Sequence, residues 1–168
     1  ITVQDTTPPV VTVPGNITRE ATSAAGAVVT FTASAMDVVD GSIIPTCSPA
    51  SGSTFPMGTT TVTCSATDAA GNTGSASFTI TVQDTTAPVV TVPSNITVVA
   101  TSSAGAVVTF TASATDIVDG AITPTCSPAS GSTFPMGTTT VTCSATDAHG
   151  NTGSASFTIT VGDTTPPV

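Results

Sequence analysis

The sequence predicts an all-β fold on three observations. Apolar and polar residues alternate with a period of two in several short segments, such as residues 61–66 and 76–82. Gly, Pro, Asp and Asn residues, which favour turns, separate these segments. The chain also repeats itself, because Asp5, Asp84 and Asp163 each open a DTT(P/A)P motif at a spacing of 79 residues. About six or seven short strands in each repeat are typical of a β-sandwich, so we predict tandem immunoglobulin-like β-sandwich domains.

The repeat sets the expected domain boundaries. Residues 5–83 and 84–162 align over their full length with few substitutions, so the chain contains two copies of one domain. Residues 1–4 match the end of the last strand of a repeat, and residues 163–168 match the start of one. We therefore expect the chain to be a window from a longer array, with short linkers that proline stiffens.

The elements of the first repeat follow from these patterns in chain order. A break at Pro14-Gly15 interrupts the first edge strand. The last two strands flank an Asp-rich turn. The expected ranges are strands at 10–13, 16–18, 27–33, 43–47, 61–66 and 76–82, turns at 36–41 and 68–72, and at most one short strand within 48–58.

The composition excludes several classes of protein. The chain has one Arg, no Lys and a net charge of −9, so no basic surface exists to neutralise the phosphates of nucleic acid. A hydrophobic content of 39% with regular alternation argues against disorder. No apolar run approaches the roughly 18 residues that a membrane-spanning helix needs.

Catalytic residues are also missing from the pattern. His149 is the only histidine and takes the place of Ala70, so a general base would exist in one of two near-identical domains. No Ser/His/Asp or Cys/His set can be assembled in the first repeat, and no glycine-rich phosphate loop occurs. We therefore predict that the protein is not an enzyme.

Each repeat carries two cysteines at equivalent positions. A domain of this size buries a modest share of its surface, so we expect one stabilising disulfide per repeat. A pair of reduced core thiols is the alternative. A disulfide would place the protein in an oxidising compartment outside the cytoplasm. The expected pairs are Cys47 with Cys64 and Cys126 with Cys143, whose separation of 17 residues is too short for the usual bridge between sheets.

One long motif resembles a known family. The run FPMGTTTVTCSATDAAGN at 55–72 returns at 134–151 as FPMGTTTVTCSATDAHGN. Together with the DTTPPV opening and the DVVDG turn, it resembles the hyalin repeat (HYR) family across both repeats. The resemblance implies an extracellular immunoglobulin-like module that occurs in tandem and is associated with adhesion or surface structures. Many members carry a further cysteine where this sequence has Ser75-Ala-Ser-Phe78, so we expect a single bridge per repeat.

Nearly all acidic residues fall in three segments that we expect to meet at one pole of each sandwich. Two like charges about 4 Å apart repel by roughly 1 kcal/mol in water, and a hard cation such as Ca²⁺ would remove that repulsion. Turn formation by Asp and Asn residues that cap their own backbone is the alternative. The candidate Ca²⁺ ligands are Asp5, Asp37, Asp40, Asp68 and Asn72 in the first repeat, and Asp84, Asp116, Asp119, Asp147 and Asn151 in the second.

Each repeat also has one N-x-T triplet, at Asn16 and at Asn95. These triplets are candidate glycosylation sites, although such triplets also arise by chance in Thr-rich chains. The outward-facing threonines could likewise bear O-linked sugar or could serve only as good strand formers.

These features predict a non-enzymatic extracellular repeat array that forms a rod, stalk or filament, stiffened by Ca²⁺ at its domain junctions. Its expected partners are adjacent repeats and identical chains in a fibre, with strand exchange between chains left open. The alternative is an adhesin binding module that recognises a glycan or a cell-surface receptor. That alternative needs an exposed aromatic or charged patch, and Phe is the only aromatic residue type in the chain.

Overall fold

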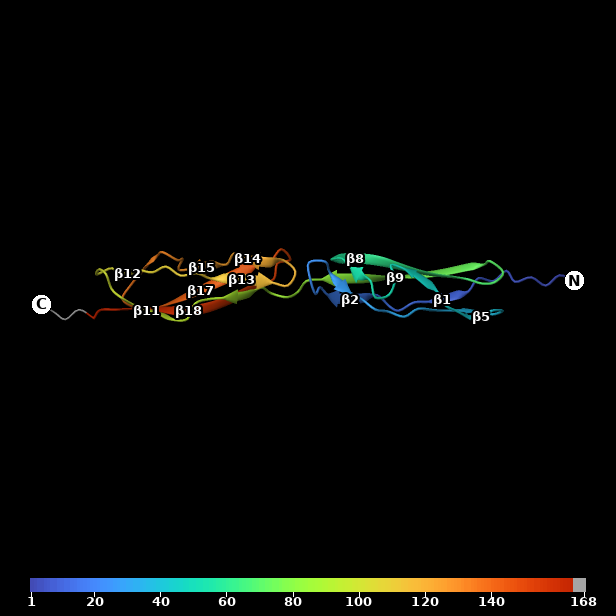
Figure 1. The fold of residues 1–168 in the computed structure, drawn as a ribbon, viewed down its shortest axis with the longest axis horizontal. Helices are drawn as coiled ribbons and strands as arrows, with labels where there is room; N and C mark the ends of the chain where they lie inside the picture. Colours follow the sequence, from blue (N-terminus) through green and yellow to red (C-terminus); the bar gives the residue numbers. More distant parts are fainter. Residues whose placement is uncertain (165–168) are drawn as a thin grey trace. The chain divides into compact units, whose positions relative to one another are not determined.

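The computed structural model confirms the predicted fold class. It describes residues 1–164, which form strands and turns without a helix (Figure 1). The predicted start of a following repeat, 163–168, therefore lies mostly outside the described residues. The chain divides into two compact units, Ile1–Asp84 and Thr85–Val168, each described here by itself.

Each unit has nine strands in the same order. Those of the first unit are β1 (Val10–Thr12), β2 (Ile17–Glu20), β3 (Ala27–Val28), β4 (Ser34–Asp37), β5 (Gly41–Ile43), β6 (Thr46–Ser48), β7 (Thr54–Phe55), β8 (Gly58–Thr67) and β9 (Thr73–Gln83). Those of the second unit are β10 (Val89–Thr91), β11 (Ile96–Val99), β12 (Ala106–Val107), β13 (Ser113–Asp116), β14 (Gly120–Ile122), β15 (Thr125–Ser127), β16 (Thr133–Phe134), β17 (Gly137–Thr146) and β18 (Thr152–Gly162).

The strands of the first unit form two layers. One sheet has the order β2-β9-β8-β6, in which β2 runs parallel to β9 and the other neighbours are antiparallel. The other layer contains the sheet β1-β4-β5 and the pair β3-β7. The second unit repeats this topology with the orders β11-β18-β17-β15, β10-β13-β14 and β12-β16.

The core lies between these layers, where the sequence predicts it. On β8, Val62 and Cys64 are fully buried and Ala66 is 4% exposed, while the intervening residues are exposed. The predicted alternation on β9 is also confirmed, since its inward face is buried around Phe78. The Phe78 ring meets Phe31 edge-on, with 5.0 Å between ring centroids, which joins the two layers.

The predicted core strand at 27–33 proves to be part of a longer extended segment. Burial alternates without a break from Ala27 to Asp37, but strand pairing covers only the two ends, β3 and β4. Met36 and Asp37 belong to β4, so the predicted turn at 36–41 is too long. The sequence shows the alternation but not the partners, which change from β7 at one end to β1 and β5 at the other.

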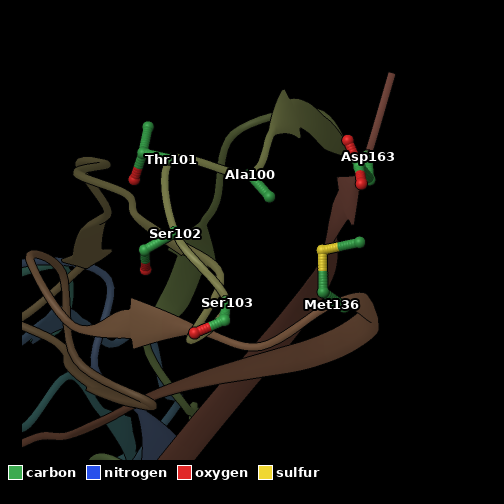
Figure 2. Close-up of a pocket in the computed structure, with 6 residues that line it drawn as sticks. All are labelled: Ala100, Thr101, Ser102, Ser103, Met136 and Asp163. Atoms are coloured by element: carbon green, nitrogen blue, oxygen red, sulfur yellow. The ribbon is translucent and has the colours of Figure 1, made fainter. Parts of the chain in front are cut away.

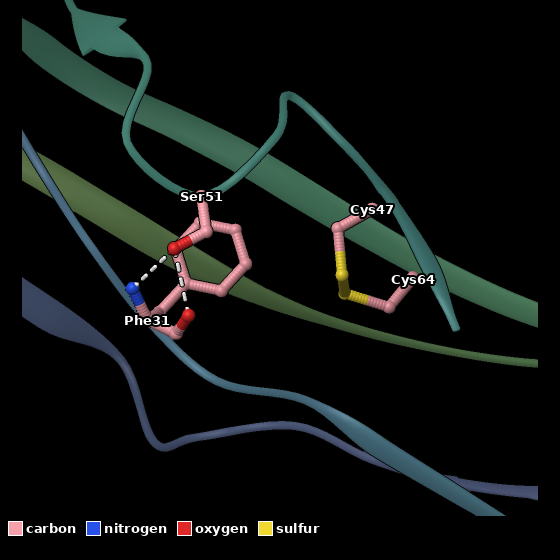
Figure 3. Close-up of a disulfide and its surroundings, with 4 residues drawn as sticks. All are labelled: Phe31, Cys47, Ser51 and Cys64. Carbon is pink, nitrogen blue, oxygen red and sulfur yellow. Dashed lines mark hydrogen bonds between the residues drawn. A yellow bond between two sulfur atoms is a disulfide. The ribbon is translucent and has the colours of Figure 1, made fainter. Parts of the chain in front are cut away.

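A serine side chain replaces a strand partner in the middle of this segment. The Ser51 hydroxyl accepts a hydrogen bond from Phe31 N (2.8 Å) and donates one to the main-chain oxygen of Phe31 (2.7 Å), as Figure 3 shows. Ser130 makes the same pair of bonds to Phe110 in the second unit. These bonds satisfy backbone groups that β7 is too short to reach.

The predicted single strand at 43–47 is wrong. The segment divides between β5, in one sheet, and β6, in the other. Pro45 separates the two strands, and a proline has no backbone N–H with which to continue a ladder. Within 48–58 the structure has one complete strand, β7, between Ser48 at the end of β6 and Gly58 at the start of β8, in agreement with the expectation of at most one short strand.

Both predicted disulfides are present and lie within a sheet. Cys47 on β6 is directly opposite Cys64 on β8, and the two Cα atoms are 4.0 Å apart (Figure 3). Cys126 and Cys143 pair in the same way on β15 and β17. Each bridge ties the short edge strand to the long central strand, as the short separation in sequence requires.

Removing the first bridge by Cys47→Ala and Cys64→Ala should lower the free energy of unfolding of the first unit by about 3 kcal/mol. The reason is that the unfolded chain regains the conformational entropy that the cross-link had removed. Urea denaturation with and without a reductant measures this effect. The same pair of changes at Cys126 and Cys143 should cause a similar loss. An unfolding midpoint that stays constant when the unmodified chain is reduced would contradict the prediction.

Gly74 allows the opening segment to pack closely on the last strand. A Cβ atom at this position would collide with the main-chain oxygen of Pro9, and a Cβ at Gly153 would collide with that of Pro88. These contacts hold the residues before β1 and β10 against β9 and β18. They explain why a glycine lies inside a long strand that otherwise favours side chains.

Gly74→Ala should therefore destabilise the first unit by about 1–3 kcal/mol, since the obstructing atom belongs to the backbone and can move little. Gly15→Ala is the matched control, because no atom lies within 4 Å of its added methyl group. Thermal denaturation gives the melting temperatures of both variants for comparison. Equal melting temperatures for the two variants would show that the contact with Pro9 is not tight.

Candidate functional site

Four carboxylates meet at one end of the first unit. Asp5, Asp37, Asp40 and Asp68, here called the first acidic cluster, each offer an oxygen, and these oxygens all lie within 4.8 Å of one another. Asp5 comes from the opening segment, Asp37 from the end of β4, Asp40 from the turn that follows it, and Asp68 from the turn after β8. The convergence of three separate segments that the sequence predicts is thus present in this unit.

Turn hydrogen bonds orient two of these side chains. Asp5 Oδ1 accepts hydrogen bonds from the backbone N (3.0 Å) and the hydroxyl (2.7 Å) of Thr7. Asp37 Oδ1 accepts them from the backbone N–H groups of Val39 (2.8 Å) and Asp40 (3.0 Å). The turn chemistry named as an alternative to Ca²⁺ binding is therefore real, but it uses only one oxygen of each carboxylate.

Further bonds hold the three segments together. Asp40 Oδ2 accepts a hydrogen bond from Ala69 N (2.9 Å), which joins the β4–β5 turn to the turn after β8. The Asn72 side-chain nitrogen donates to the main-chain oxygen of Asp5 (3.3 Å) and to Asp68 Oδ2 (2.8 Å). Asn72 thus acts as a donor that fixes the turn, and its predicted role as an oxygen ligand stays a prediction.

Asp68 remains ionised because of its donors. Partial burial alone would raise the pKa of Asp68, but the hydrogen bonds from the Asn72 side chain and from the backbone N–H groups of Asn72, Gly71 and Ala70 outweigh it and lower the pKa. Asp147 has a lowered pKa for the same reasons, with Asn151 and His149 among its donors. Both carboxylates are therefore negatively charged at neutral pH.

Two oxygens of the first acidic cluster have no hydrogen-bond partner. Asp5 Oδ2 and Asp37 Oδ2 are both inaccessible to solvent and unpartnered among the described residues. The whole Asp37 residue is only 4% exposed. Arg19, the single arginine in a chain without lysine, lies on β2 and donates to the main-chain oxygen of Thr18 (3.0 Å). A buried carboxylate oxygen that lacks a donor is costly unless a cation meets it.

The second unit has a related group of side chains. Asp119, Asp147 and His149 each offer one ligand atom, and these atoms lie within 4.8 Å of one another. Asp116 Oδ1 accepts hydrogen bonds from Val118 N (2.7 Å) and Asp119 N (2.9 Å), and its Oδ2 is buried without a partner. Asp84, the counterpart of Asp5 in the repeat, is the last residue of the first unit and is 7% exposed.

His149 lies beside the carboxylates, although the sequence analysis did not include it among the candidate ligands. Its Nδ1 lies 3.4 Å from Asp119 Oδ2, whereas the equivalent Ala70 offers no ligand atom. The available signal was its position inside the DAHGN turn, between Asp147 and Asn151. The two units thus present different donor sets, four carboxylates in the first and a mixture of carboxylates and imidazole in the second.

The predicted glycosylation residues also have a structural role. Asn16 Oδ1 accepts a hydrogen bond from Thr79 N on β9 (3.0 Å), and Asn95 Oδ1 accepts one from Thr158 N on β18 (3.0 Å). Both residues are exposed. Their glycosylation stays a prediction.

A pocket of about 340 Å³ in the second unit offers no catalytic set. Figure 2 shows Met136 and Asp163 on one side and the hydroxyl-bearing residues of a loop on the other. The lining contains one carboxylate and three hydroxyl groups, without a histidine or cysteine beside them. The lining residues are Ala100, Thr101, Ser102, Ser103, Met136 and Asp163.

Comparison with known proteins identifies the family of this chain. The HYR domain model matches residues 4–82 and 83–161. The chain belongs to the HYR domain family. This confirms the resemblance drawn from the long repeated motif, whose cysteine lies on β8 and whose Asp-rich turn carries Asp68.

Two relatives are both named hyalin. The protein from Lytechinus variegatus is 40% identical over 175 residues, which cover 98% of this chain and 33% of the relative. The protein from Strongylocentrotus purpuratus is 42% identical over 178 residues, which cover 100% of this chain and 15% of the relative. The chain therefore spans a third or less of the length of either relative.

A solved structure, the protocadherin gammaB7 EC3-6 cis-dimer, is similar with a TM-score of 0.36 and 16% identity over 95% of this chain and 52% of that chain.

The HYR family gives the chain its general character. HYR domains are extracellular, which confirms the predicted location outside the cell or at its surface. The chain is therefore an extracellular repeat protein of an adhesion-related family. Among the described residues, the structure contains no helix of the length and apolar character needed to cross a bilayer.

Proposed function

We propose that these HYR repeats belong to a non-enzymatic extracellular array that forms a rod, stalk or filament, and that Ca²⁺ binds at the acidic clusters. The observation that carries the cation proposal is the buried and unpartnered Oδ2 of Asp37, within a group of four carboxylates. Among the described residues, no hydrogen-bond donor meets this oxygen.

Calcium suits this donor set better than softer metals. The first acidic cluster consists only of carboxylates, and Ca²⁺ takes six to eight oxygen ligands in flexible geometry. Thiolate and imidazole, which favour zinc and copper, are absent from it. Asp5 Oδ2 and Asp37 Oδ2 are the first candidate ligands, because no donor competes for them. Asp40 and Asp68 would complete the set while keeping their turn bonds through a second lone pair.

The position of the ligands in the repeat supports a stiffening role. Asp5 and Asp84 occupy the same place in the 79-residue repeat, in the segment that precedes the first strand. A cation held by that segment and by two turns of the domain would restrict the linker through which successive repeats are joined. The repeat boundaries that we propose, 5–83 and 84–162, follow from this 79-residue period.

The same features support a structural rather than catalytic role. The pocket lining lacks a nucleophile paired with a general base, and His149 has no counterpart in the first unit. Adjacent repeats and identical chains are the proposed partners. N-linked sugar at Asn16 and Asn95 would modify the surface of such an array without altering its core, since both residues are exposed.

A second candidate function is an adhesin module that binds a cell-surface receptor or glycan through an exposed apolar pair, rather than through the aromatic or charged patch expected from the sequence. Val10 and Met36 are direct partners across β1 and β4, and they are 69% and 59% exposed. Electron microscopy of the native material distinguishes the two functions. Long uniform fibres support the structural array, whereas dispersed particles that bind cells support the adhesin.

The Ca²⁺ proposal predicts that the effect of Asp37→Asn changes sign with calcium. Without Ca²⁺ the asparagine keeps the turn bonds through Oδ1, removes one buried charge and presents an N–H donor to the other carboxylates, so stability should rise. With Ca²⁺ in 100-fold excess over the dissociation constant, the unmodified chain should gain about 2.7 kcal/mol, and the variant should gain much less. Thermal unfolding in EDTA and in CaCl₂ measures both effects.

Glu20→Gln is the matched control for this experiment. It removes one negative charge from β2, which lies toward the other end of the first unit from β5 (Figure 1). Its calcium response should equal that of the unmodified chain. Identical unfolding curves of the unmodified chain in EDTA and in CaCl₂ would refute the proposed site.

A further inference from the structure

We propose that each unit has an open strand edge through which a second copy of this chain associates by β-strand pairing. In the first unit this open edge consists of Val28, Thr30 and Thr32, and in the second of Val107, Thr109 and Thr111. The inference rests on the part of the proposed function in which identical chains associate. It adds the surface and the geometry of that contact.

Among the described residues, the segment 27–33 has backbone partners on one side only. Val29 N donates to Ser53 O (3.2 Å), Gly52 N donates to Val29 O (2.9 Å), and the Ser51 hydroxyl bonds to both backbone groups of Phe31. Successive residues of an extended strand direct their N–H and C=O groups to opposite edges. The backbone groups of residues 28, 30 and 32 are therefore directed away from the segment 51–55.

On that other side no neighbouring strand is present among residues 1–164. β1 pairs with β4 only as far as Thr12, opposite Ser34, and the chain then departs through Pro14 to form β2 in the other sheet. Within residues 1–164 no backbone hydrogen bond is made by Thr30 or Thr32. A cavity of about 300 Å³ marks the gap left by the departing strand. Its lining residues are Thr12, Val13, Pro14, Thr32, Ala33 and Ser34.

The open edge lacks the usual protection against pairing. Natural proteins protect an edge strand with lysine or another charge, with proline, with a bulge or with a covering segment. The segment 27–33, AVVTFTA, contains no charged residue and no proline, and Val28 is 63% exposed. Val107 in the second unit is 64% exposed, so the edge recurs in the array.

A second copy of the chain is the partner that this edge fits. In antiparallel pairing about Thr30, Val28 of each copy lies opposite Thr32 of the other, and β-branched residues pair well across strands. The edge carries no charge, so two acidic chains can approach there without direct repulsion. The first acidic cluster includes Asp37, beyond one end of the same segment, so antiparallel pairing directs the two clusters to opposite ends of the contact.

Such a contact is short, so one pair of units should associate weakly. An array repeats the edge in every unit, and contacts linked in one chain add up through effective concentration. Lateral association would thus strengthen with the number of repeats. The acidic clusters remain free to bind cations, because the backbone edge uses none of their oxygens.

Sedimentation equilibrium of the 168-residue chain, in EDTA and separately in CaCl₂, tests the inference. The edge variant combines Thr30→Lys and Thr109→Lys, which place like charges opposite each other in the proposed pairing. The control combines Thr61→Lys and Thr140→Lys, which make the same change at exposed positions in the middle of β8 and β17. We expect the edge variant to associate about tenfold more weakly than the unmodified chain or more, and the control to associate nearly as well.

Hydrogen exchange adds a residue-level measurement. The amides of Thr30 and Thr32 should exchange more slowly as the chain concentration rises, whereas the amide of Phe31, already bonded to Ser51, should change little. Melting temperatures of both variants verify that they fold.

The inference would be overturned if the unmodified chain stayed monomeric up to about millimolar concentration, a range in which even weak contacts appear. It would also be overturned if the edge variant associated as strongly as the unmodified chain, or if association of the control variant were weakened as much as that of the edge variant. Association in EDTA is independent of the calcium site. Failure of the Ca²⁺ proposal and failure of the open edge are therefore distinguishable.

Discussion

The antiparallel ladder between β8 and β9 is the constraint on which the rest of each unit depends. It joins ten residue pairs, from Gly58 opposite Val82 to Thr67 opposite Thr73. Its inner face supplies Val62, Cys64 and Phe78 to the core. One edge of the ladder receives β6 and the disulfide, the other edge receives β2 in parallel, and its closing turn contains Asp68. The core, the bridge and the acidic cluster are thus consequences of one long hairpin.

Much of this arrangement is predictable from the sequence because period-two alternation and turn residues are local signals. The strands around Val62 and Phe78, the break at Pro14-Gly15 and the turn at 68–72 all follow from neighbouring residues. The pairing of Cys47 with Cys64 follows from the count of two cysteines per repeat. Where the signal is local, the expected element and the observed one agree.

Features that depend on tertiary partners were predicted poorly. The segment 43–47 reads as one strand, but its two halves pair with different sheets, and alternation alone cannot show a change of partner. The role of Ser51 as a substitute for a strand depends on the path of a loop. In the acidic cluster, the sequence indicates which carboxylates converge, but it could not show that Asp37 Oδ2 lacks a donor or that His149 lies beside Asp119.

The parallel pairing of β2 with β9 has a mechanical consequence for a chain of HYR domains. β2 lies near the beginning of the unit and β9 ends it, and their ladder joins Ile17 to Ile80 and Glu20 to Gln83. Tension applied at the two ends of a unit pulls these neighbours in opposite directions along their length. The hydrogen bonds between them are then loaded together in shear, rather than opened one after another from one end. A domain built in this way resists extension along its own chain, because several hydrogen bonds must break at once.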